Sequence, residues 1–297
     1  MFVHAPAQES AAEDKQHLAD AVLRSAAGCW LVVTLLGQWL FMYYVVALYG
    51  AATVTGRFED WTKKATLFKG YLPGDTIGNL AFASHVLFAA VLAFGGALQL
   101  IPQVRERAIA VHRWNGRAFL VAAAMVGGGG LYMVWVRHAR FNNLLACAVS
   151  LDAVLILVFV ALTWRAARER DIARHRRWAL RTFLVAQGAG FSIRVLYAGW
   201  SVFTAGAGTG KDMDGPTDYV FAFATYLLPL AILELYLRAR DSAGTLARFA
   251  TAIVLVALTA YTVAGTLAAA MARRALVGRL TRALLQLLRE QLRIAAA

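Results

Sequence analysis

Apolar residues run through most of the chain in long blocks that are separated by short charged segments. Seven blocks come close to the roughly 20 residues that a helix needs to cross the hydrocarbon core of a membrane. They cover residues 26–50, 77–101, 116–136, 143–164, 178–203, 218–238 and 248–271. Because lipid offers no partner to backbone polar groups, each block is expected to form an α-helix. The pattern predicts an all-α, polytopic transmembrane helical bundle of about seven spans.

The same pattern divides the chain into three regions. Residues 1–25 form a charged N-terminal segment, residues 26–271 form the transmembrane helical domain, and residues 272–297 form a tail. In the tail, leucines recur on one helical face while most arginines lie elsewhere, which is typical of a basic amphipathic helix. Seven spans place this tail on the outer side. Either it binds an anionic surface there, or the number of spans is wrong by one.

Composition and charge agree with a membrane protein. Of the 297 residues, 60% are hydrophobic and only 16% are charged, which excludes an ordinary soluble domain. The net charge of +13 resides mostly in the connecting segments, so it indicates membrane orientation and not nucleic-acid binding. Counted over alternate connections, Lys and Arg number 15 on the side of the N-terminal segment and 7 on the other. This predicts a multi-pass protein of the bacterial inner membrane with a cytoplasmic N-terminus.

Ionisable residues within three of the predicted spans form a first candidate site. Asp152 lies nine residues after the outer end of the fourth span, and Arg194 lies nine residues before the outer end of the fifth. At a rise of about 1.5 Å per residue the two reach the same depth, and His85 of the second span reaches a similar level. Because buried charge is costly unless paired, we expect an ion pair between Asp152 and Arg194, with His85 completing a ligand-binding site. The alternative is an ion pair that only fixes helix packing.

A repeated basic motif at two span entrances forms a second candidate site. Each copy combines a histidine, one or two arginines and a tryptophan with a further arginine, on the side predicted to be cytoplasmic. The residues are His112, Arg113, Trp114 and Arg117 before the third span, and His175, Arg176, Arg177, Trp178 and Arg181 before the fifth. Cationic donors beside an aromatic ring suit lipid phosphate or another anion. The alternative is ordinary positive-inside charge with an aromatic belt.

Two further patterns concern contacts between spans. Arg181 and Glu234 reach similar depths near the inner face and are a second candidate pair, although both side chains are long enough to reach the interface. Glycines at 95–96 and 127–130 remove side chains where two helices touch, or where a flat cofactor lies against the backbone. Close helix packing is the commoner cause of such glycines.

In their order along the chain, these motifs resemble those of a bacterial membrane family that is known only as a domain of unknown function. The resemblance covers about residues 77–200 and rests on Ser84, His85, Gly95, Gly96, Gln99, Pro102, Arg105, Arg107, the two basic motifs and Arg194. It implies a multi-helix membrane fold and singles out His85, His112, His175, Arg181 and Arg194, without an activity. More loosely, the chain is similar to four-helix b-type cytochromes, which implies haem b held between histidines of neighbouring spans. The chain departs from that pattern because its fourth span has no histidine.

Three functions remain open. The first is binding or transport of a small polar or amphiphilic ligand at the buried cluster, with membrane lipids on the basic motifs. The second is haem-dependent electron transfer, an oxidoreductase activity in which His112 and His175 are the axial ligands. The third is a structural or assembly subunit whose partners are other membrane subunits or a second copy. No arrangement of nucleophile, base and oxyanion donors is evident, so the sequence argues against a hydrolytic enzyme and assigns no catalytic residue.

Overall fold

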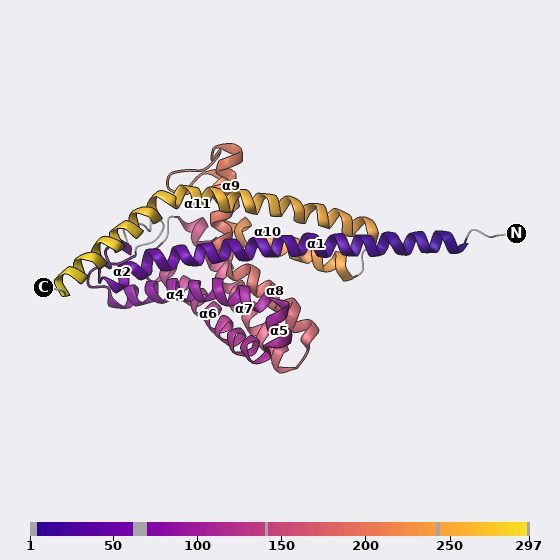
Figure 1. The fold of residues 1–297 in the computed structure, drawn as a ribbon, viewed down its shortest axis with the longest axis horizontal. Helices are drawn as coiled ribbons and strands as arrows, with labels where there is room; N and C mark the ends of the chain where they lie inside the picture. Colours follow the sequence, from indigo (N-terminus) through magenta and orange to yellow (C-terminus); the bar gives the residue numbers. More distant parts are fainter. Residues whose placement is uncertain (1–4, 62–69, 140–141, 242–243, 296–297) are drawn as a thin grey trace.

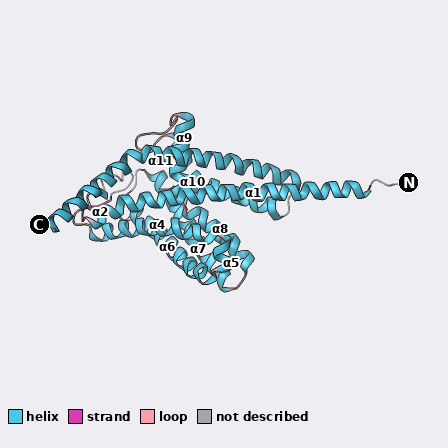
Figure 2. Cartoon of the chain, viewed as in Figure 1, coloured by secondary structure: helices cyan, strands magenta, loops and turns pink. Residues whose placement is uncertain are grey.

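The chain folds almost entirely into helices, and no strand occurs among the residues described. The computed structural model describes residues 5–61, 70–139, 142–241 and 244–295. The α-helices are α1 (Ala5–Val45), α2 (Ala51–Val54), α4 (Thr76–Leu100), α5 (Pro102–Arg107), α6 (Ile109–Trp135), α7 (Asn143–Arg168), α8 (Ile172–Ala186), α9 (Ile193–Thr204), α10 (Pro216–Asp241) and α11 (Thr245–Ala295). Two π-helical segments, η1 (Val46–Gly50) and η2 (Gly188–Ser192), complete the description. The predicted all-α polytopic bundle is confirmed (Figure 2).

Six of the described helices are long and apolar enough to cross a membrane. They are Glu13–Val45 within α1, α4, α6, α7, α10, and Thr245–Ala272 within α11. The segment expected to be the fifth of seven spans, residues 178–203, is not one continuous α-helix, because α8 and α9 are separated at η2. The start of α1 and the end of α11 lie at opposite ends of the molecule (Figure 1), as an odd number of passes requires. The broken α8–α9 segment is not among these six helices, so the seventh span stays a prediction.

The terminal helices run past the boundaries expected from the sequence. The helix α1 includes much of the charged segment at 1–25 without a break before the first span, and α11 continues through the tail to Ala295. The side chains beyond residue 272 lie outside the described residues, as do those of residues 1–12. The amphipathic character of the tail therefore stays a prediction. The helices α1 and α11 pack along each other, and α11 also packs on α9 (Figure 1).

Glycines permit the closest helix contacts. A Cβ atom at Gly96 of α4 would lie 2.9 Å from the rings of both Phe119 and Phe183. At Gly95 the space is taken by Asn115 of α6, whose side-chain amide donates a hydrogen bond of 2.8 Å to the Gly95 carbonyl. These contacts support close packing as the reason for the glycines at 95–96, since α4 and α6 are one of the most extensively packed helix pairs.

Candidate functional site

The break between α8 and α9 organises the interior of the bundle. The sequence from Gln187 to Ser192 includes Gly188 and Gly190, and the backbone between the two helices takes a π-helical conformation. Gly188 is needed for close approach, because a Cβ atom there would lie 2.8 Å from Cβ of Tyr226 in α10. Local π-helical segments are frequent at functional sites, and interrupted helices line the binding sites of many membrane transporters.

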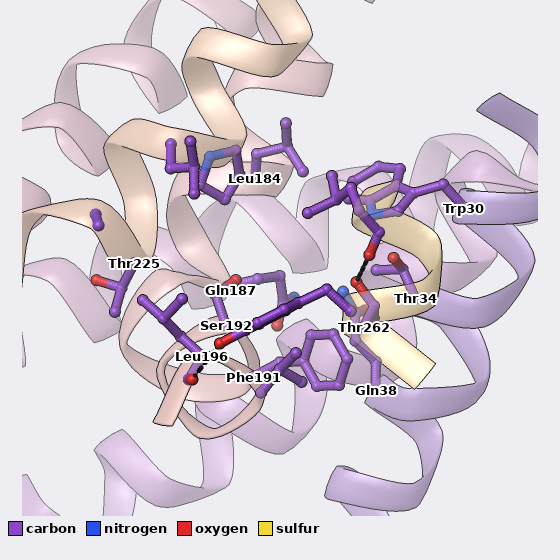
Figure 3. Close-up of a pocket in the computed structure, with 16 residues that line it drawn as sticks. Trp30, Thr34, Gln38, Leu184, Gln187, Phe191, Ser192, Leu196, Thr225 and Thr262 are labelled. Carbon is purple, nitrogen blue, oxygen red and sulfur yellow. Dashed lines mark hydrogen bonds between the residues drawn. The ribbon is translucent and has the colours of Figure 1, made fainter. Parts of the chain in front are cut away.

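A cavity of about 70 Å³ lies beside this break (Figure 3). Its walls come from α1, α10, α11 and the α8–α9 segment. The lining residues are Trp30, Thr34, Gln38, Leu184, Gln187, Phe191, Ser192, Val195, Leu196, Ala224, Thr225, Leu228, Pro229, Leu258, Tyr261 and Thr262. None of these described lining residues carries a charge. A volume of about 70 Å³ holds several water molecules, each of which needs roughly 10 to 15 Å³, or the polar head of a ligand.

The α1 wall of this cavity is a stripe of polar side chains that lack partners. Trp30, Thr34 and Gln38 are spaced four residues apart, which places them on one helical face. Gln38 is fully buried, and neither its side-chain oxygen nor its nitrogen has a hydrogen-bond partner among the described residues. The same holds for the hydroxyl of Thr34 and the indole nitrogen of Trp30. Each such buried group costs about 1 to 3 kcal/mol if it stays unsatisfied, so the stripe favours an occupied cavity.

The polar lining residues of α11 and the α8–α9 segment are better satisfied. Tyr261 donates its hydroxyl to the Leu196 carbonyl at 2.7 Å, and Thr262 donates to the Leu258 carbonyl at 2.7 Å. The side-chain amide of Gln187 donates to the Leu92 carbonyl at 3.3 Å, across the bundle interior. The unmet hydrogen-bonding capacity of the cavity is thus concentrated on α1.

Asp152 of α7 also lies against the break. Its side chain is 4% exposed, and one carboxylate oxygen, Oδ1, has no hydrogen-bond partner among the described residues. The other oxygen lies 3.5 Å from the point where Gly188 would carry a Cβ atom. The carboxyl group is therefore packed directly against η2, and Tyr226 of α10 is a titratable neighbour with which it interacts.

The three residues of the predicted outer-half site do not form one cluster. Among the described contacts there is no ion pair between Asp152 and Arg194, so the expectation of this pair was wrong. Arg194 donates a hydrogen bond to the Gly190 carbonyl and lies 4.6 Å over the Phe41 ring of α1. The error has a physical cause, because depth along a span fixes height but not the face of the helix from which a side chain projects.

His85 occupies a third position, against α6. A Cβ atom at Gly129 would lie 3.8 Å from Nδ1 of His85, and one at Gly130 would lie 4.0 Å from Cε1. The histidine therefore packs over the glycine run of α6, and its Nδ1 has no hydrogen-bond partner among the described residues. The binding roles expected for His85, Asp152 and Arg194 stay predictions. The three side chains have different neighbours and do not form one site.

The two basic motifs come together at one end of the bundle. The imidazoles of His112 and His175 are close enough to interact electrostatically, and Nδ1 of His175 donates to the Thr163 carbonyl at 3.1 Å. Arg177 pairs with Asp241, and Arg181 pairs with Glu234. Arg117 lies 4.8 Å over the ring of its neighbour Trp114, which is 69% exposed. The expected pairing of Arg181 with Glu234 is confirmed, while binding of lipid or anions by the motifs stays a prediction.

The polar stripe on α1 was missed in the sequence because each of its residues has a common explanation. Trp30 lies close to the expected start of the first span, where a tryptophan is typical of the aromatic belt, whereas its indole nitrogen is buried beside the cavity. Thr34 and Gln38 look unremarkable alone. The available signal was their spacing from Trp30, since three polar groups four residues apart mark one face of an otherwise apolar helix.

These features define a polytopic α-helical membrane protein with an uncharged, mostly apolar cavity beside a broken helix, where the α1 wall carries a stripe of polar residues. A family model described as "Predicted membrane protein (DUF2306)" matches residues 82–237, which is more than half of the chain. The chain belongs to this family, as the motifs of the sequence indicate. The match includes η2 and Asp152 but neither α1 nor α11, which supply two walls of the cavity. No curated protein and no solved structure matches the chain, so the looser similarity to b-type cytochromes finds no support in these comparisons.

Proposed function

We propose that the protein binds the neutral polar head of a small amphiphilic molecule in the cavity between α1, α10, α11 and the broken α8–α9 segment. The observation that carries the proposal is the fully buried Gln38, whose amide has both a free donor and a free acceptor among the described residues. A head group with a hydroxyl function would meet both needs, because a hydroxyl accepts from the amide nitrogen and donates to the amide oxygen. Because the described lining is uncharged, a neutral head is favoured over an ionic one.

The size and position of the cavity support the same class of ligand. A volume of about 70 Å³ is well below the roughly 300 to 1,000 Å³ of pockets that enclose a whole drug-sized molecule. Leu196, Leu228 and Leu258 add apolar surface around the polar stripe, which suits the first carbons of an aliphatic tail. The break at η2 gives the ligand a wall that can move, as alternating access in a transporter requires.

A photoactivatable medium-chain alcohol tests the proposal directly. Reacted with the purified protein in nanodiscs and mapped by peptide mass spectrometry, the alcohol should label the segments 30–38 and 187–196. A photoactivatable alkane of the same length lacks the hydroxyl and should label the lipid-facing surface without this preference. Gln38→Leu should reduce labelling by the alcohol about tenfold, since the loss of roughly 1.4 kcal/mol of hydrogen bonding corresponds to that factor.

The matched control is Gln99→Leu. Gln99 is also a helix glutamine, but its side-chain amide donates to the His112 carbonyl at 2.9 Å. Its replacement should lower thermal stability and leave labelling of the cavity unchanged. Gln38→Leu should instead keep or raise the stability of the ligand-free protein, because it removes two unsatisfied groups. Equal labelling by the alcohol and the alkane would show that the cavity does not select a polar head.

A further inference from the structure

A buried carboxyl group lies against the break at Gly188 and is not among the residues that line the cavity. Asp152 is in the interior of α7, and Gly188 is the residue of η2 that faces it. In the interior of a membrane protein a carboxylate is costly unless it is paired. Asp152 forms no ion pair with another described residue, and its Oδ1 has no hydrogen-bond partner among them. An intramembrane acidic group without a counter-charge is typical of a proton-binding position.

The surroundings of Asp152 contain little that could hold its negative charge. From α10 the facing titratable group is the phenol of Tyr226, whose hydroxyl is already donated to the Ala148 carbonyl at 3.1 Å. From η2 the neighbour is Gly188, which has no side chain. In α8 the charged Arg181 is bound by Glu234, and from α6 the contact beside Asp152 is Gly127 against the Ala153 carbonyl. The neutral, protonated acid therefore fits the closed packing around η2.

Ionisation of Asp152 would change the packing of the carboxyl group against η2. When the acid loses its proton to water, the carboxylate needs hydrogen-bond donors, and the backbone of η2 lies beside it at Gly188. A helix break has amide groups outside the regular i to i−4 pattern, so it can offer donors or admit water at a lower cost than an intact helix. Two other residues of η2, Phe191 and Ser192, line the proposed ligand cavity.

We propose that Asp152 is a proton-binding site whose ionisation opens the α8–α9 break, so that proton release is coupled to access to the cavity. The coupling to a ligand rests on the proposed function above. The proton site and the opening of the break do not, because they follow from the packing of Asp152 on Gly188.

Hydrogen exchange of the intact protein in nanodiscs tests this proposal without any ligand. After correction for the intrinsic pH dependence of amide exchange, the peptide that covers 187–192 should open more as the pH rises. The change should approach about tenfold per pH unit within the transition, the limit for an equilibrium coupled to one proton. Asp152→Asn mimics the protonated acid and should leave exchange of this peptide slow and independent of pH. Asp152→Glu keeps a titratable group and should keep the pH dependence.

The control is Glu169→Gln, which removes an exposed carboxylate at the end of α7 and should behave as the unchanged protein. A wild-type peptide 187–192 without corrected pH dependence would overturn the proposal, and this result does not require any variant to fold. An Asp152→Asn protein that retains the pH dependence would overturn it as well. If exchange behaves as expected while the photoactivatable alcohol shows no selectivity, the proton site stands and the proposed ligand fails.

Discussion

Arg181 and Glu234 join the broken α8–α9 segment to α10 through two parallel hydrogen bonds of 2.7 and 2.9 Å. The guanidinium also lies 4.7 Å over the ring of Trp178. The Arg181 side chain is 16% exposed and that of Glu234 is 35% exposed, so the pair is only partly screened by solvent. This is the arrangement in which an arginine fork is most specific for a carboxylate.

Arg181→Gln and Glu234→Gln should each lower the stability of the protein by about 1.5 to 3 kcal/mol, the usual value of hydrogen bonds to charged groups. The double variant should lose much less than the sum of the single losses, because the two residues form one interaction. Thermal unfolding in one detergent measures all three. Glu169→Gln, which breaks an exposed pair with Arg165, should change stability by no more than about 1 kcal/mol. Additive single losses would contradict the pairing.

The glycines of α4 and α6 allow a matched comparison. Gly96→Ala should destabilise by about 1 to 3 kcal/mol, because a methyl group there meets two aromatic rings in a filled core. Gly128→Ala should be neutral or stabilising by up to about 1 kcal/mol, because nothing lies within 4 Å of the new atom and alanine favours a helix. Thermal unfolding of the two variants in the same detergent would decide. A stability loss at Gly128 as large as at Gly96 would argue against the helix contacts described.

The contacts of Asp75 at the start of α4 should make the stability of the folded protein depend on pH in the acidic range. The backbone N–H of Gly78 donates to its carboxylate and the guanidinium of Arg137 pairs with it at 2.8 Å, and these contacts hold the pKa of Asp75 below its ordinary value of 3.8. A lowered pKa in the folded protein means that the contribution is present above 3.8 and is lost as the pH falls through the folded value.

Asp75→Asn should therefore lower the melting temperature near neutral pH and lose this difference in strong acid. Melting curves of both proteins across the acidic range provide the measurement. Asp60→Asn, where the carboxylate is paired with the exposed Arg57 at the longer distance of 3.6 Å, serves as the comparison and should show a smaller convergence. A constant difference between wild type and Asp75→Asn at all pH values would indicate that the charge of Asp75 does not contribute.

Orientation in the membrane follows from the distribution of positive charge. We expect the ends of the bundle that carry residues 102–115 and 165–177 to face the cytoplasm. In a background with Cys29 and Cys147 replaced by alanine, a cysteine at Arg107 or Arg170 should resist an impermeant maleimide added to intact spheroplasts. A cysteine at Lys211 should react. Modification at the first two positions would reverse the orientation.

The basic motifs predict lipid binding beside those loops. Arg177 and Arg181 are already paired, so Arg113 and Arg176 are the better candidates for a lipid phosphate. Replacing these two by glutamine should weaken retention of anionic lipid in native mass spectrometry, while the spans stay inserted. The double variant of the exposed Arg165 and Arg168 is a charge-matched control. Equal retention in both double variants would leave only a role in orientation.

The fold was predictable from the sequence to the extent that hydrophobicity determines it. The length of the apolar blocks predicted the six long helices, and the depth of Arg181 and Glu234 predicted a pair that the structure contains. The depth of Asp152 and Arg194 gave a pair that it does not contain, because helix rotation is set by packing at Gly188 and Phe41. The cavity was not predictable for the same reason. It requires knowing that Gln38 of α1 faces the break in a segment far away in sequence.

Pro229 gives the cavity a mechanical property that the chemistry of its lining does not reveal. Proline lacks an N–H group, so within α10 the carbonyl of Thr225 loses its helical donor, and both residues line the cavity. On the facing wall, η2 interrupts the α8–α9 segment. Two of the bundle's walls therefore have their least stiff points around the same small space. Bending of either helix would change the width of the cavity without any movement of the long helices α1 and α11.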